Sequence, residues 1–153
     1  MELSRRQLLV IVGAATVGGC THGSGDGLEG PPPAFSRGPV DAGPVRDYSH
    51  DGIYSELRDS SGFFVFRQSN RLFARSALCT HRACKLNVSS GGLLCPCHGS
   101  TFTVDGHVTR GPARRDLPGF VVEKSAQDHL IVHTDRPLSA DQLDTSAGFV
   151  EVD

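Results

Sequence analysis

The sequence of 153 residues has no tryptophan, one methionine and two tyrosines, and its formal net charge is only -2. It also contains no internal repeat, no coiled-coil heptads and no apolar run beyond about 12 residues. The small net charge gives no electrostatic reason to expect a nucleic-acid-binding protein. The 18 glycines and 9 prolines disfavour regular helix and argue against a helical bundle. A hydrophobic content of 38% still allows one packed domain, which excludes a chain that is disordered throughout.

The N-terminal residues predict an export signal. Arg5 and Arg6 precede an apolar segment from Leu8 to Gly19, an arrangement that resembles a twin-arginine signal. The segment is shorter than the ~20 residues of a membrane-spanning helix. Val17-Gly18-Gly19-Cys20 resembles a bacterial lipobox, so we expect residues 1–19 to be a signal peptide and Cys20 to carry lipid at the periplasmic face of a membrane. The alternative is that Cys20 is an ordinary free thiol.

The remaining chain divides into a tether, a domain and a short extension. Gly and Pro fill eleven of the twenty-four positions from Gly23 to Arg46, which predicts a solvated tether over residues 20–46. Past residue 47, apolar residues come in short blocks separated by turn formers, including a two-residue hairpin signal at Asp105-Gly106. We predict an all-β domain of small antiparallel sheets over residues 47–137. In the extension, residues 138–153, the segment Phe149-Val150-Glu151-Val152 either adds an edge strand or frays.

Two boxes of cysteine and histidine carry the chemistry. The first is Cys79-Thr80-His81-Arg82-Ala83-Cys84, and the second is Cys95-Pro96-Cys97-His98-Gly99-Ser100. Two thiolates and two imidazoles from facing loops suit tetrahedral zinc as well as an iron-sulfur cluster, and the spacing leaves the metal undecided. A site with two thiolates uses only two of the four cysteines. In an oxidising compartment, a disulfide between the other two is expected.

The paired boxes resemble those of the Rieske iron-sulfur proteins, Cys-x-His-x-x-Cys followed by Cys-x-Cys-His-Gly-Ser, over about Phe63 to Pro118. The resemblance implies a Rieske-type domain with a cluster-binding subdomain of two facing loops and one [2Fe-2S] cluster. It further implies that Cys79 and Cys95 bind the inner iron, that His81 and His98 bind the outer iron, and that Cys84 and Cys97 form the disulfide. A structural zinc module with no redox role is the alternative.

The implied function is one-electron transfer. With two thiolates and two neutral imidazoles, the oxidised centre has no net charge, which places the potential at roughly -150 to +300 mV. Ser100 is expected to donate a hydrogen bond to a bridging sulfide, and Pro112 to begin a loop that covers the cluster. Phe102 stands where quinol-oxidising members carry Tyr. We therefore expect a potential below that of the respiratory-complex type and above that of the ring-hydroxylating dioxygenase type.

The expected partners follow from the same resemblance. We expect the protein to be an electron carrier, or the Rieske subunit of a quinol- or arsenite-oxidising complex, and we expect no catalysis by the chain alone. A cytochrome or oxidoreductase subunit is the expected redox partner, and a membrane quinol is a candidate donor. Arg82-Ala83 replaces a Leu-Gly pair whose Leu lies at the quinone-docking surface of cytochrome bc complexes. Arg110, Arg114 and Arg115 either steer an acidic electron partner or form a charged exposed loop.

Overall fold

The computed structural model describes residues 37–153. The predicted export signal, the lipobox with Cys20 and the first part of the tether lie outside these residues. The described part contains eleven β-strands and two short 3-10 helices, η1 (Val45–Asp47) and η2 (Ala140–Gln142), and no α-helix. No helix in residues 37–153 has the length and apolar character needed to cross a membrane. The prediction of an all-β domain is confirmed.

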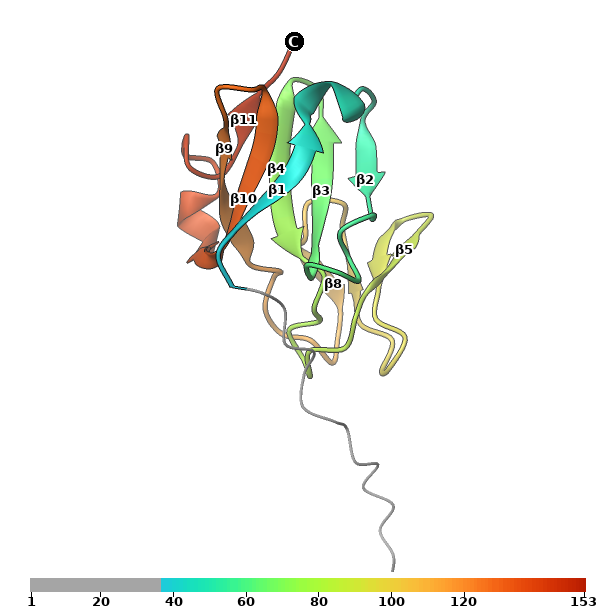
Figure 1. The fold of residues 1–153 in the computed structure, drawn as a ribbon. Coiled ribbons are helices and arrows are strands. Elements are labelled where there is room, and N and C mark those ends of the chain that lie inside the picture. Colours follow the sequence, from blue (N-terminus) through green and yellow to red (C-terminus); the bar gives the residue numbers. More distant parts are fainter. Residues whose placement is uncertain (1–36) are drawn as a thin grey trace, which may run out of the picture.

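The larger of two sheets is built from strands far apart in the sequence. Its order is β1-β10-β9-β4-β3-β2, and β11 also pairs with β4. The strands are β1 (Pro39–Pro44), β2 (Gly52–Tyr54), β3 (Phe63–Gln68), β4 (Arg71–Ser76), β9 (Gly119–Lys124), β10 (His129–Leu138) and β11 (Val150–Glu151). All pairings are antiparallel, and the sheet forms the upper part of the molecule in Figure 1.

The smaller sheet is a meander inserted between β4 and β9. It has the order β5-β6-β7-β8, with β5 (Asn87–Ser89), β6 (Gly92–Leu94), β7 (Thr101–Phe102) and β8 (Val108–Arg110). Gly92 has a φ of +132°, and a Cβ there would collide with the carbonyl oxygen of Phe102 in β7. The expected hairpin at Asp105-Gly106 forms, but its loop has three residues. The Thr103 N–H donates to the His107 carbonyl across the loop, and the Gly106 N–H donates to the Thr103 carbonyl within it.

Strands form within both of the segments that composition assigned to the tether and to the extension. Residues 39–44 lie in β1, where Val40 pairs with Val132 and Asp41 with Ile131 of β10. Proline is tolerated there because β1 is an edge strand, in which one side needs no ladder partner. At the other end, Val150 pairs with Leu72, so the last segment adds a strand to the sheet. The folded domain therefore begins before residue 47 and continues beyond residue 137.

Strand β3 separates two apolar cores. Phe63 and Val65 lie in a core with Leu72, whereas Phe64 and Phe66 belong to a second core that also contains Cys79, Cys95 and Phe102. Successive side chains of a strand point to opposite faces, so the continuous apolar run of β3 serves both cores. The second core joins the large sheet to the cysteine-containing loops and gives the site a rigid base.

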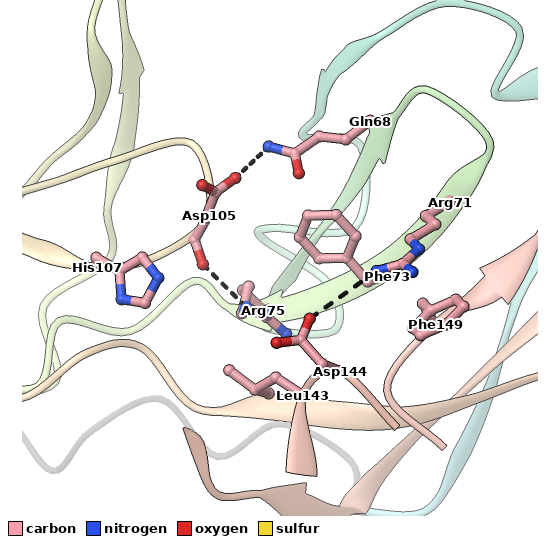
Figure 2. Close-up of a pocket in the computed structure, with 9 residues that line it drawn as sticks. All are labelled: Gln68, Arg71, Phe73, Arg75, Asp105, His107, Leu143, Asp144 and Phe149. Carbon is pink, nitrogen blue, oxygen red and sulfur yellow. Dashed lines mark hydrogen bonds and ion pairs between the residues drawn. The ribbon is translucent and has the colours of Figure 1, made fainter. Parts of the chain in front are cut away.

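A cleft of about 210 Å³ marks the junction between the sheets (Figure 2). Arg75 of β4 is 6% exposed, and its Nε donates a 3.1 Å hydrogen bond to the carbonyl oxygen of Asp105 in the β7–β8 turn. Burial lowers the pKa of this guanidinium, which stays charged because arginine starts far above neutral pH. Its guanidinium also lies over the ring of Phe73, 4.8 Å from the centroid. The Gln68 amide donates to the Asp105 carboxylate, so two residues of the large sheet hold the smaller one.

Candidate metal centre

The two cysteine-histidine boxes form loops with the same backbone geometry. In the first, the Cys79 N–H donates to the Cys84 carbonyl and the Ala83 N–H donates to the Cys79 carbonyl, both at 2.8 Å. In the second, the Cys95 N–H donates to the Ser100 carbonyl at 2.8 Å and the Gly99 N–H to the Cys95 carbonyl at 3.0 Å. Each six-residue loop is thus closed by two hydrogen bonds. Its first residue is a buried cysteine.

The fifth residue of each loop has a left-handed backbone. Gly99 has a φ of +74° and Ala83 has a φ of +56°. Glycine adopts this conformation freely, whereas a side chain with Cβ is disfavoured by about 1 kcal/mol or more. The first loop therefore carries a strained residue at the position equivalent to a glycine in the second.

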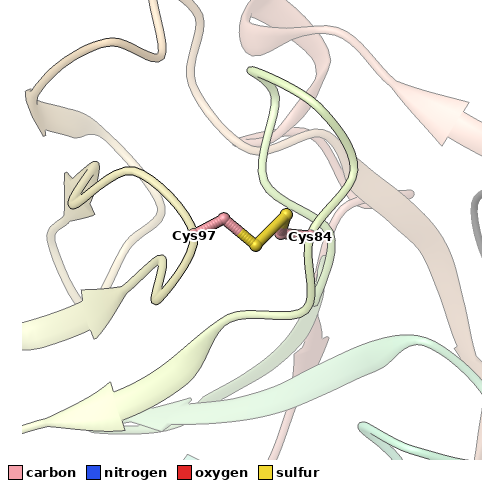
Figure 3. The surroundings of a disulfide bond; sticks show 2 residues. All are labelled: Cys84 and Cys97. Atoms are coloured by element: carbon pink, nitrogen blue, oxygen red, sulfur yellow. A yellow bond between two sulfur atoms is a disulfide. The ribbon is translucent and has the colours of Figure 1, made fainter. Parts of the chain in front are cut away.

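A disulfide joins the two loops. Cys84 and Cys97 are bonded, with their Cα atoms 6.5 Å apart, as the Rieske resemblance implies (Figure 3). The Sγ atoms of Cys84, Cys95 and Cys97 all lie within 4.8 Å of one another. Two of these sulfurs are in the disulfide and cannot act as thiolate ligands, so the group is not a three-thiolate metal site.

Two cysteines remain reduced and lie in the protein interior. Cys79 is 2% exposed and Cys95 is 1% exposed, and both belong to the second apolar core. Burial raises the pKa of the Cys95 thiol, and the neighbouring Cys79 adds to the rise. Because a thiol with a raised pKa favours its neutral form, the Cys95 sulfur becomes a thiolate when a metal supplies the compensating positive charge.

Two imidazoles lie on the outer side of the buried cysteines. The rings of His81 and His98 have centroids 4.9 Å apart and are nearly perpendicular. His98 is exposed and His81 is half-buried. Among the described residues, the buried Nδ1 of His81 has no hydrogen-bond partner, which is the state expected of a nitrogen that ligates a metal. Two buried sulfurs and two nitrogens from the less buried histidine rings fit a dinuclear iron-sulfur cluster with an inner and an outer iron.

Three further residues surround this group. The hydroxyl of Ser100 is fully buried and accepts a 3.0 Å hydrogen bond from the Ala113 N–H, so its own hydrogen remains available to a sulfide. Phe102 is buried in the core that holds Cys79 and Cys95 and offers no hydroxyl. Pro112 directly precedes Ala113, which places the predicted covering loop against the second box. The tuning roles of Ser100, Phe102 and Pro112 stay predictions.

Sequence reasoning missed one residue that positions the site. Thr80 lies between Cys79 and His81, and its hydroxyl donates a 2.6 Å hydrogen bond to the carbonyl of Arg115. This bond ties the first box to the covering loop, as Ser100 ties the second. The only signal in the sequence was a hydroxyl residue between two expected ligands, and its partner lies 35 positions away.

A model of the Rieske [2Fe-2S] domain matches residues 38–121, which is more than half of the chain. Among curated relatives, the chloroplastic cytochrome b6-f complex iron-sulfur subunit of Bigelowiella natans is 47% identical over 47 residues, covering 29% of this chain and 19% of the relative. The cytochrome b6-f complex iron-sulfur subunit 2 of Synechocystis sp. is 38% identical over 61 residues, covering 39% of this chain and 34% of that relative. The chain thus spans at most about a third of the length of these two relatives.

One similar solved structure is the cyanobacterial plasma membrane Rieske protein PetC3 from Synechocystis PCC 6803. It is 31% identical, with a TM-score of 0.47, and the match covers 61% of this chain and 97% of that one. The segment that matches the Rieske family model starts at residue 38, next to β1, and contains both boxes. This family match decides between zinc and an iron-sulfur cluster, which the spacing of the boxes alone left open. The chain belongs to the Rieske [2Fe-2S] domain family and holds one [2Fe-2S] cluster, a one-electron redox centre.

Proposed function

We propose that this protein is an exported, lipid-anchored electron carrier or redox-complex subunit, and that Cys79, Cys95, His81 and His98 are the cluster ligands. The observation that carries the proposal is the gradient of burial across the site: the two free thiols are buried, and the two imidazoles lie toward the surface. Thiolates in the interior hold the inner iron away from water. The imidazoles give an electron a short path to a partner at the surface.

The proposed roles of the surrounding chain follow from its contacts. The disulfide and the hydrogen bonds of Thr80 and Ser100 hold the two ligand loops and the covering loop in one arrangement. A rigid shell keeps the ligand atoms in place when the centre gains or loses an electron, and it limits the entry of water. The chain itself binds, orients and shields the cluster, which when present supplies the electron-transfer chemistry.

The redox potential is proposed to be intermediate within the Rieske range. The hydroxyl of Ser100 can stabilise the added negative charge, which raises the potential, whereas Phe102 lacks the hydroxyl that would raise it further. The relatives named above are subunits of cytochrome b6-f complexes. This supports a redox complex as the setting, with a cytochrome or another oxidoreductase subunit as partner and a quinol as a candidate donor.

The membrane attachment rests on the N-terminal sequence. The Arg5-Arg6 pair and the apolar segment that follows support twin-arginine export, and the small residues before Cys20 support lipidation. Twin-arginine export moves folded proteins, which suits a cofactor inserted before transport. Mass spectrometry of the mature N-terminus tests this part: a diacylglyceryl group on Cys20 is expected, and an unmodified start elsewhere rejects the anchor.

Spectroscopy of the purified protein tests the cluster and its ligands. Iron and acid-labile sulfide are expected in a one-to-one ratio, and the dithionite-reduced protein should show the anisotropic paramagnetic signal of mixed-valence iron at low temperature. His81→Ala and His98→Ala should each abolish this signal, whereas His50→Ala, outside both boxes, should leave it unchanged. Zinc without sulfide, or a signal that survives both substitutions, contradicts the proposal.

A further inference from the structure

Charge is divided unevenly over the described part of the protein. The cluster-end loops, defined as residues 79–84, 95–100 and 110–116, contain four arginines, Arg82, Arg110, Arg114 and Arg115, and one acidic residue, Asp116. The rest of residues 37–153 contains nine basic and thirteen acidic residues. One end of the domain is therefore positive, although the domain as a whole carries a small net negative charge.

The single carboxylate of the cluster-end loops is engaged within the fold. One oxygen of Asp116 accepts a 2.7 Å hydrogen bond from the Val108 N–H, and the other lies 2.8 Å from Nδ1 of His107. Among residues 37–153, no carboxylate lies within 4 Å of the guanidinium groups of Arg114 and Arg115. Both arginines are exposed. Their positive charge is therefore offered to solvent or to a partner.

These arginines surround the predicted exit point of the electron. A surface cleft of about 370 Å³ is lined by Thr80, His81, Pro112, Arg114 and Arg115. The imidazole of His81 thus shares one hollow with two unpaired guanidinium groups. A quinone ring needs an apolar slot, but Pro112 is the only apolar residue in this lining.

We infer that the cluster-end loops form the docking face for an acidic redox protein, which places a carboxylate in the cleft beside His81. This inference rests on the proposed function, because it assumes that the electron leaves through the imidazole side of the site. In the transfer, one electron leaves the reduced domain and lowers the oxidation state of the partner's metal by one, with no bond formed or broken. The arginines orient the encounter and increase its rate.

The shape of the site favours a protein over an anionic membrane surface. A side-chain carboxylate reaches into a hollow, whereas a bilayer presents a broad layer of charge that would cover His81. Arginine also binds carboxylates through paired hydrogen bonds, which gives direction to the contact. A lipid surface is therefore treated as an opposing outcome of the test.

Salt-dependent electron transfer with two oxidants of opposite charge tests the inference. The reduced holoprotein is mixed in a stopped-flow instrument with an acidic plant plastocyanin or with basic mitochondrial cytochrome c. Between 0.01 M and 0.1 M salt, the Debye length falls from about 30 Å to about 10 Å. Oxidation by plastocyanin should slow by on the order of tenfold, and oxidation by cytochrome c should not slow. The net negative charge of the domain alone predicts the reverse: slower oxidation by cytochrome c at higher salt, and no slowing with plastocyanin. The direction in which each rate changes with salt therefore decides between the two.

Charge variants assign the effect to this face. Arg114→Glu should flatten the salt dependence with plastocyanin, and Arg114→Lys should retain most of it. Arg46→Glu is the matched control, because it changes the net charge equally and its side chain is 84% exposed. It lies in η1, at the end of the large sheet away from the smaller sheet (Figure 1). Arg46→Glu should leave the slope within about twofold of the parent.

Three results would overturn the inference. The first is a plastocyanin rate that is independent of salt or rises with it. The second is an equal effect of Arg46→Glu and Arg114→Glu. The third is that Arg114→Glu weakens binding to phosphatidylglycerol vesicles but leaves the plastocyanin slope unchanged, which assigns the face to lipid. All three measurements use protein that shows the paramagnetic signal of the reduced cluster. Absence of that signal contradicts the proposed function and not the docking face.

Discussion

The Cys84–Cys97 disulfide should contribute about 3 kcal/mol to the free energy of unfolding. The two cysteines are separated by 13 positions, so the bond closes a loop of about 14 residues. Restricting such a loop in the unfolded chain is worth about 3 kcal/mol at 25 °C by the loop-entropy relation. In a domain of this size the corresponding loss of Tm on removing the bond is about 10–15 °C.

The double variant Cys84→Ser/Cys97→Ser provides the measurement. Both cysteines are replaced because Cys84→Ser alone leaves the Cys97 thiol within 4.8 Å of Cys95, where a non-native disulfide can form. Denaturant unfolding followed by circular dichroism gives the change in free energy. The cluster should also be lost faster from the variant, measured by the decay of its visible absorption, since each loop is then held by hydrogen bonds without a covalent link between the two boxes.

Reduction of the parent protein is the internal control. A reductant should lower the stability of the parent to that of the double variant and leave the variant unchanged. A loss below about 1 kcal/mol in the double variant would refute the reasoning. It would mean that the hydrogen bonds of Thr80 and Ser100 to the covering loop already restrict both boxes, and that the disulfide adds little.

Three other substitutions test the remaining features of the site. Ala83→Gly should stabilise the protein by about 1 kcal/mol in denaturant unfolding, because it relieves the left-handed alanine at φ +56°. Ser100→Ala should lower the midpoint potential in a redox titration by on the order of 60 mV, the equivalent of one charge-assisted hydrogen bond, and Phe102→Tyr should raise it. The pKa of Asp116 is lowered by hydrogen bonds from Val108 and His107, so its ionised form stabilises the fold above its ordinary pKa and this contribution is lost as the pH falls through the lowered value. Asp116→Asn should therefore flatten the acid side of a stability-against-pH curve, by less than about 1 kcal/mol because the side chain is 38% exposed; an unchanged curve contradicts this.

The sequence by itself determined the chemistry of the site and the class of the fold. Each box is a six-residue segment closed by its own backbone hydrogen bonds, so residue type and spacing within it are enough to predict a metal-binding loop. Alternating apolar blocks and turn formers were likewise enough to predict an all-β domain, because the strand period and the turns are local properties. The pairing of Cys84 with Cys97 followed from the family pattern rather than from spacing.

Only the tertiary structure decided how these local pieces meet. The strand β1, which composition alone assigned to the tether, pairs with β10 about ninety positions away, and no local signal reports such a partner. The burial of Cys79 and Cys95 below the two imidazoles depends on the core that both sheets share. The positive end arises because the fold brings Arg114 and Arg115 to the cleft beside His81, whereas the net charge of the sequence averages over the whole chain. Long-range contacts decide these features, because burial and local charge depend on which distant residues become neighbours.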